Sequence, residues 1–201
     1  MLLGMSLRER KRARTRQALI DAATELFERK GYDETTVADI AAAAEIGART
    51  FFSYFASKEE LLFPEADARI QAAIEAIATR EPTEGPADVL LRALGEVSDT
   101  SDDLVSPLSA LRLRMIQTVP AVRGRALQLQ LDAQREIAKH LADAFPDQLD
   151  LVRAGALTGA FVGAVTGALQ ALFDTADAAD PAALRTAMRT ATEVALTPWR
   201  A

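Results

Sequence analysis

The 201-residue chain contains no cysteine and a single histidine, His140. The absence of cysteine excludes disulfides, thiolate metal sites and thiol catalysis. One histidine is too few for most metal sites and for a histidine-pair acid–base mechanism, and the sequence has no glycine-rich phosphate loop. A helical hydrolase or transferase would lack its catalytic groups. We therefore expect neither an enzyme nor a resident metal or cofactor.

Aromatic residues are scarce (5%), as are valine and isoleucine, whereas 49% of the residues are hydrophobic and alanine supplies much of that fraction. Runs of alanine, leucine, glutamate and arginine, separated by proline and glycine, favour helices over strands. The opening "MLLGMSL" is too short for a signal peptide. The sequence thus predicts an all-α protein in the cytoplasm.

The net charge of −6 argues against general affinity for nucleic acid, but the charge is unevenly distributed. Within the first twenty residues, Glu9 is the single acidic residue among six basic ones: Arg8, Arg10, Lys11, Arg12, Arg14 and Arg16. Such a run is either the solvated start of a helix or a basic arm for an anionic partner. The composition leaves both interpretations open.

Helical periodicity, caps and proline positions predict about nine helices. A first helix covers about 8–30 and stops at Gly31, and a short second helix is capped by Thr35 or Thr36. Gly47 is expected to supply a positive φ in the turn "EIGAR". A second short helix then runs from about 48 to 55, before further helices at about 57–80, 86–98, 107–119, 120–145, 147–173 and 181–197.

The fourth of these helices begins at "SKEE", where Ser57 and Glu60 have the spacing of a capping box. Pro64 is expected to kink or break it. "EPTEGP" (81–86) reads as a linker before the next helix.

Two short helices joined by a tight turn, after a longer helix, are typical of a helix-turn-helix. In "RTFFSYF", Phe51 and Phe55 are four residues apart and should pack into the small core with Ile40, Ala44 and Ile46. Phe52, Ser53 and the Arg49–Thr50 pair then point outward, and Tyr54 lies between the two faces. A packing face and a contact face would share seven residues.

Residues 16–62 resemble the N-terminal domain of TetR-family transcriptional regulators. The matching motifs are "AAxxLF" at 22–27, "KGY" at 30–32, "TTVxDIA" at 35–41, "TFxxYF" at 50–55 and "SKEEL" at 57–61. The resemblance implies a DNA-binding domain at 8–56, after a disordered segment at 1–7, and an effector-binding and dimerisation domain at 57–201.

The resemblance also implies roles for individual residues. Ala48 to Tyr54 would form the recognition helix, with Arg49 and Thr50 reaching base edges. Phosphate or backbone contacts, including those of the basic arm, would come from Thr36, Tyr54, Lys58, Arg12 and Arg16, and Phe52 and Ser53 would face the groove. The chain departs from the family at Glu45, where glycine is usual, at Phe52, where tyrosine is common, and at Ala48, which has no polar side chain.

Residues 154–173 carry no charge, and glycine recurs every four residues at 155, 159, 163 and 167. This pattern is that of a membrane helix with repeated GxxxG or of a soluble helix that another helix approaches closely. Its many glycines and alanines make it only moderately hydrophobic and favour the second interpretation. The helix could also be the core of a monomer. In the family the last two long helices form an intersubunit bundle, which implies dimerisation through Gly159, Phe161, Gly163, Val165 and Gly167.

The resemblance further implies a small-molecule effector between the middle helices, with about 57–80 linking the cavity to the DNA-binding domain. The candidate contacts are Leu108, Arg112, Met115, Gln134 and His140. Arg112 with Arg114 suits an anionic effector, and some relatives respond to acyl-thioesters. We therefore expect a homodimeric, ligand-responsive repressor on a palindromic operator. The alternative is a helical adaptor or small-molecule-binding protein that keeps the fold without operator binding.

Overall fold

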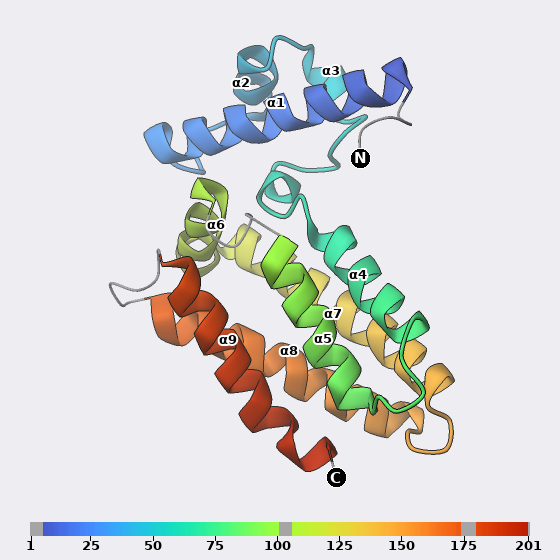
Figure 1. The fold of residues 1–201 in the computed structure, drawn as a ribbon. Coiled ribbons are helices and arrows are strands. Elements are labelled where there is room, and N and C mark those ends of the chain that lie inside the picture. Colours follow the sequence, from blue (N-terminus) through green and yellow to red (C-terminus); the bar gives the residue numbers. More distant parts are fainter. Residues whose placement is uncertain (1–5, 101–105, 174–179, 201) are drawn as a thin grey trace. The chain divides into compact units, whose positions relative to one another are not determined.

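The computed structural model describes residues 6–100, 106–173 and 180–200 (Figure 1). Within these residues the secondary structure consists of nine α-helices and two short 3-10 helices, η1 and η4. The all-α prediction is confirmed. The chain divides into two compact units: unit 1 comprises the residues up to Pro64 together with Leu111–Arg125, and unit 2 comprises Glu65–Ala110 with the residues from Ala126 onward. This division differs from the expected boundary after residue 56.

Helix α1 (Leu7–Lys30) opens unit 1. The Ser6 hydroxyl accepts the Glu9 amide N–H and the Glu9 carboxylate accepts the Ser6 N–H, a capping box that fixes the first turn. The predicted disorder of 1–7 is therefore wrong for Ser6 and Leu7, and residues 1–5 lie outside the described residues. Gly31, with φ of 86°, ends the helix as predicted.

Helices α2 (Val37–Ala43) and α3 (Ala48–Phe51) are joined by a left-handed turn. The turn centres on Glu45, which has φ of 57°, whereas Gly47 has an ordinary φ of −76°; the prediction that Gly47 takes the positive φ is wrong. The Glu45 N–H donates to Ala42 O at 3.1 Å and the Ile46 N–H to Ala41 O at 2.9 Å. This is the Schellman pattern that ends helices, here without its usual glycine.

The chain after α3 forms a 3-10 helix, η1 (Glu59–Leu62), and then α4 (Ala66–Ala78). The predicted helix over 57–80 is thus broken at Pro64. The predicted capping box is wrong in its pairing, because the Glu60 carboxylate accepts the Ala56 N–H at 2.8 Å rather than that of Ser57.

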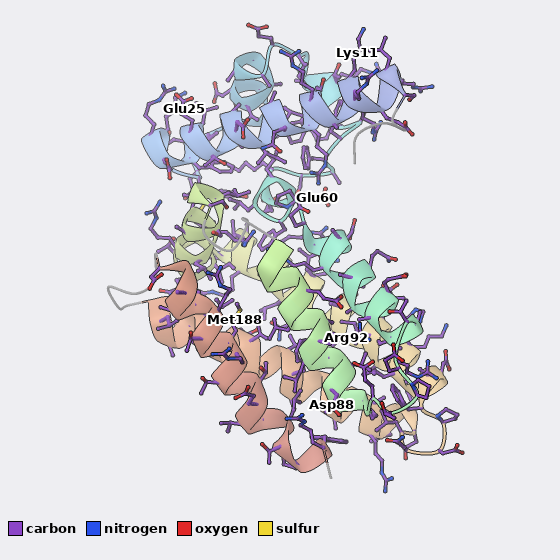
Figure 2. The ribbon with its side chains drawn as sticks, viewed as in Figure 1. Lys11, Glu25, Glu60, Asp88, Arg92 and Met188 are labelled. Carbon is purple, nitrogen blue, oxygen red and sulfur yellow. The ribbon has the colours of Figure 1, made fainter. Side chains whose placement is uncertain are left out.

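Unit 1 also contains parts of α6 (Pro107–Thr118) and α7 (Pro120–Ala144). Arg112 is 8% exposed and donates to Leu62 O at 3.2 Å. Arg125 forms an ion pair with Glu60 at 2.9 Å; Glu60 is labelled in Figure 2. These two contacts bind η1 to residues fifty or more positions later in the chain.

Unit 2 contains α4, α5 (Pro86–Thr100), α8 (Leu151–Phe173), α9 (Pro181–Leu196) and η4 (Thr197–Trp199), with most of α7. Helices α8 and α9 run side by side (Figure 1). Arg92 on α5 pairs with Glu84 at 2.7 Å and donates to Ala76 O at 2.8 Å, which holds the linker and α4 against α5 (Figure 2). Alanine and leucine side chains from α4, α5, α7 and α8 build the core.

Helix α8 has one face in this core and one outside it. Leu157 and Phe161 are buried, and Val165 packs against the same cluster. By contrast, a Cβ added to any of the four glycines at 155, 159, 163 and 167 would meet no neighbouring atom within 4 Å. Phe161 therefore belongs to the core rather than to the exposed glycine face with which we grouped it.

By length and composition alone, Leu151–Leu172 could also cross a membrane, with a mean hydropathy of 1.4. It is the single such segment among the described residues. One segment of this kind is weak evidence, because core helices of soluble proteins pass the same test.

Candidate nucleic-acid interface

Helix α3 and the turn after it separate two kinds of side chain. Phe51 and Phe55 are buried with their ring centroids 5.9 Å apart, whereas the intervening Phe52 is 59% exposed. Arg49, Thr50 and Ser53 are exposed as well. The regular helix is shorter than the predicted 48–55, but Tyr54 N–H and Phe55 N–H both donate to Phe51 O and continue the helical turn. The predicted inward and outward faces are confirmed.

Thr36 begins α2, and its hydroxyl is already hydrogen-bonded. It accepts the Asp39 N–H at 3.1 Å and donates to the Asp39 carboxylate at 2.9 Å, while that carboxylate also accepts the Thr36 N–H at 3.0 Å. The backbone hydrogen bond from Thr36, together with its hydroxyl, lowers the pKa of Asp39. The hydroxyl that we expected to donate to a phosphate is therefore occupied. A phosphate at this helix end would also meet the Asp39 carboxylate.

Arg12 and Arg16 extend from α1 toward the end of the α3 turn. The Arg12 guanidinium lies 5.1 Å from the Tyr54 ring centroid and donates to Ser53 O at 3.1 Å. One turn later, Arg16 lies 5.0 Å from the Phe55 ring centroid and donates to Pro64 O at 2.9 Å. Arg12 is exposed and Arg16 is half-buried. Both residues that we assigned to a DNA-binding arm thus have partners within unit 1.

Lys58, which follows α3, makes similar contacts with the connection between α1 and α2. Its ammonium donates to Tyr32 O at 2.7 Å and to Thr35 O at 2.9 Å, and it lies 3.9 Å from the Tyr32 ring centroid. The Tyr32 hydroxyl donates to the Glu59 carboxylate. Burial and this hydrogen bond raise the pKa of the Tyr32 phenol. These contacts tie the α1–α2 connection to the segment that follows α3.

The remaining basic residues of α1 stay at the surface. In its N-terminal half these are the exposed Arg8, Arg10, Lys11 and Arg14 (Lys11 is labelled in Figure 2). Together with Arg12 and Arg49 they give unit 1 a set of exposed cations in a protein of net negative charge.

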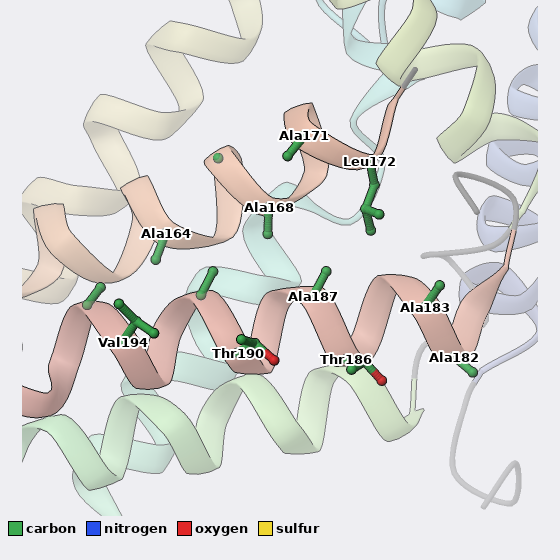
Figure 3. A pocket seen from close by; sticks show the side chains of 13 residues that line it. Ala164, Ala168, Ala171, Leu172, Ala182, Ala183, Thr186, Ala187, Thr190 and Val194 are labelled. Carbon is green, nitrogen blue, oxygen red and sulfur yellow. The ribbon is translucent and has the colours of Figure 1, made fainter. Parts of the chain in front are cut away.

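In unit 2, a groove of about 900 Å³ lies between α8 and α9 (Figure 3). Small apolar side chains from both helices face it, among them Ala164, Ala168, Ala187 and the largely exposed Val194. Gly167 lines the same groove, so part of the predicted glycine stripe belongs to it. Two threonines of α9, Thr186 and Thr190, give it a small polar component.

The five predicted effector residues are divided between the two units. Leu108, Gln134 and His140 belong to unit 2, whereas Arg112 and Met115 belong to unit 1, where Arg112 binds a backbone carbonyl. A different cavity, of about 520 Å³, lies between α5 and α9 in unit 2. Its lining combines Leu91 and Leu94 of α5 with Arg185 and Arg189 of α9. The i, i+4 spacing of the two arginines is visible in the sequence, but their position near α5 depends on the tertiary fold.

Comparison with known proteins agrees with this geometry. The sequence model of the family described as "Bacterial regulatory proteins, tetR family" matches residues 19–63. The HTH-type transcriptional regulator TcmR of Streptomyces glaucescens is 35% identical over 144 residues, which are 69% of this chain and 64% of TcmR. The chain thus matches slightly less than two thirds of that relative's length.

Two solved structures share the fold. Thermus thermophilus FadR, a TetR-family transcriptional repressor in complex with lauroyl-CoA, gives a TM-score of 0.56 at 20% identity, over 90% of this chain and 93% of FadR. A transcriptional regulator from Cytophaga hutchinsonii gives 0.58 at 17% identity, over 92% and 98% of the two chains. The sequence model places residues 19–63 in the tetR family of bacterial regulatory proteins, and the solved structures show that the fold of the chain is shared.

Proposed function

We propose that the protein is a sequence-specific DNA-binding regulator of transcription whose α3 turn enters the major groove. The observation that carries the proposal is the division of one short segment into buried Phe51 and Phe55 and exposed Arg49, Thr50 and Phe52. Helix-turn-helix proteins use such a segment to bring side chains to base edges.

The exposed side chains suit distinct parts of a duplex. The guanidinium of Arg49 can donate two hydrogen bonds to guanine, and Thr50 can contact a thymine methyl or donate through its hydroxyl. Phe52 offers an apolar contact to a thymine methyl but no donor for a phosphate. The partner we propose for Ser53 and Tyr54 at the end of the turn, and for the exposed cations of α1, is the sugar–phosphate backbone.

We propose further that the protein acts as a homodimer on a palindromic operator. One α3 turn per chain reads only a few base pairs, whereas a two-fold dimer doubles the contacts and imposes symmetry on the target. Two features of unit 2 support a second copy as partner: the apolar α8–α9 groove and the exposed glycine face of α8. Close approach of another helix requires side chains this small.

We propose a small amphipathic anion, such as an acyl-thioester, as the effector of a ligand-responsive repressor in the cytoplasm. The α5–α9 cavity supports this class, because leucines there can contact an apolar body while Arg185 and Arg189 face an anionic group. FadR, which shares the fold, was crystallised with lauroyl-CoA. Such a ligand regulates only if it binds one conformation more tightly than the other.

Selection of bound sequences from random duplex DNA tests the DNA-binding proposal. The wild type should enrich a palindrome with half-sites about one helical turn apart. Arg49→Ala should bind the selected operator about 10- to 100-fold more weakly and lose preference at one position of each half-site. Arg135→Ala is the matched control, since it removes an arginine whose side chain is 83% exposed on α7 in unit 2. If the wild type enriches no sequence, the adaptor alternative replaces the regulator.

A further inference from the structure

The position of α3 depends on how its two ends are held. A helix of four residues makes too few internal hydrogen bonds to be stable in isolation. Its N-terminal side follows the Schellman turn at Glu45, and Gly47 O accepts the Thr50 N–H at 2.8 Å. On its C-terminal side the chain leaves the helix at Phe52 and reaches η1 at Glu59. This second side is held mainly by side chains from elsewhere in unit 1.

Two half-buried cations hold it, and each combines the face of an aromatic ring with backbone carbonyl oxygens. Arg16 packs on the ring of Phe55 and donates to Pro64 O. Lys58 packs on the ring of Tyr32 and donates to the carbonyls of Tyr32 and Thr35. Arg16 thus binds α1 to both ends of the Phe55–Pro64 segment, and Lys58 binds that segment to the chain preceding α2.

We propose that Arg16 and Lys58, which we term the carbonyl clamp, position α3 for DNA and do not themselves contact phosphate. An ammonium has three N–H donors, and two of those of Lys58 are used at 2.7 and 2.9 Å. Turning it toward a phosphate would break both hydrogen bonds at partly buried carbonyls, of which Tyr32 O keeps the Thr35 N–H at 3.3 Å, and would remove the cation from the Tyr32 ring. Turning Arg16 toward a phosphate would likewise remove its hydrogen bond from Pro64 O and the cation from the Phe55 ring.

Arg12 differs from the clamp in its exposure. It makes comparable contacts with Tyr54 and Ser53, but its side chain stays at the surface together with Lys11 and Arg14. Exposed cations can bind phosphate without losing a buried partner. Within the basic stretch of α1, the half-buried Arg16 thus differs from the surface cations beside it.

This proposal rests on the proposed function, and the salt dependence of operator binding tests it. A residue that neutralises a phosphate contributes about one unit to the slope of log K against log salt, and its removal lowers the slope by that amount. We expect Arg16→Met and Lys58→Met to weaken binding about tenfold or more with the wild-type slope. Methionine keeps a long apolar stem for the aromatic ring but donates no hydrogen bond.

Amide hydrogen exchange in the free protein supplies a second measurement that needs no DNA. Both variants should exchange faster at residues 47–55 than the wild type, while amides in the middle of α1 remain protected. Lys11→Met is the matched control, because it removes the same charge from an exposed position and should leave exchange at 47–55 unchanged. Lys58→Gln, which keeps donors but not the charge, should give exchange between the wild-type and Lys58→Met rates.

A slope about one unit lower for each clamp variant, with exchange at 47–55 unchanged, would overturn the proposal and restore direct phosphate contact. Failure of the proposed function looks different. In that case the wild type itself binds no duplex selectively, and the exchange measurement still decides whether the clamp holds α3.

Discussion

Helix α3 has four residues and α8 has 23, and the two are held in place by different interactions. Around α3, the contacts are a capping box, a left-handed turn, two buried phenylalanines and cations bonded to carbonyls. Helix α8 has no charged side chain from Ala154 to Phe173 and packs one face into the core of unit 2. A Cβ added to any of its four glycines would meet no neighbouring atom of the described residues within 4 Å.

The difference teaches where each helix should be sensitive to change. A helix too short to sustain itself depends on specific side chains at its ends, so single substitutions there should alter its position. A long helix tolerates the loss of individual contacts, but an unpartnered apolar face requires a partner or remains in water. Substitutions around α3 should therefore displace α3. Substitutions on the glycine face of α8 should instead change the oligomeric state.

The largest expected effect is at Phe51. Phe51→Ala removes a fully buried ring and should lower the free energy of unfolding by about 3–5 kcal/mol. Phe52→Ala removes the neighbouring ring, which is mostly exposed, and should change it by less than about 0.5 kcal/mol. Urea denaturation followed by circular dichroism measures both. Equal losses for the two variants would contradict the division of the α3 segment into two faces.

An intermediate effect is expected on the glycine face of α8. Gly163→Leu adds volume where a second copy would approach and should weaken the proposed dimer by about 1–3 kcal/mol, or roughly 5- to 150-fold in Kd. Gly124→Leu is the control, because Gly124 is also an exposed helical glycine with open space around its Cβ position. Light scattering across a concentration series gives both constants. A dimer unaffected by Gly163→Leu would place the interface elsewhere.

The smallest effect is expected at Glu45, where a side chain occupies a left-handed conformation. Glu45→Gly relieves that strain but gives the unfolded chain more freedom, so the net gain should be about 0.5–1 kcal/mol. Thermal unfolding measures it. Glu45→Ala should bring no such gain, since alanine keeps the Cβ; an equal gain from both variants would attribute the effect to the lost charge.

Much of this fold follows from local sequence signals. Asp180 and Pro181 predict the start of α9, and the Asp180 carboxylate does accept the Ala182 N–H at 2.9 Å. Gly31 predicts the end of α1, and the spacing of Phe51 and Phe55 predicts the buried face of the α3 turn. Each signal acts within four residues of the feature it predicts. Local interactions of this kind depend little on the rest of the chain.

The features that the sequence did not predict involve either register or distance. We expected the positive φ at Gly47 because glycine adopts it most easily. A Schellman turn places the positive φ on the second residue after the helix, and α2 ends at Ala43, so the positive φ falls on Glu45. Lys58 and Tyr32 are 26 residues apart, and Arg16 and Pro64 are 48 apart, so nothing in the sequence marks their pairing. A similar distance along the chain separates Arg112 from Leu62, whose carbonyl accepts its hydrogen bond.

The discontinuous composition of unit 1 affects how the protein is made. Arg112 and Arg125 bind Leu62 and Glu60, yet Glu65–Ala110, which belongs to unit 2, is translated between the two pieces of unit 1. At roughly 5–20 residues per second, a ribosome needs several seconds to supply the later piece after the earlier one has emerged. During that interval the nascent chain contains an incomplete unit 1. A fragment truncated at residue 64 would lack the second piece of unit 1 permanently.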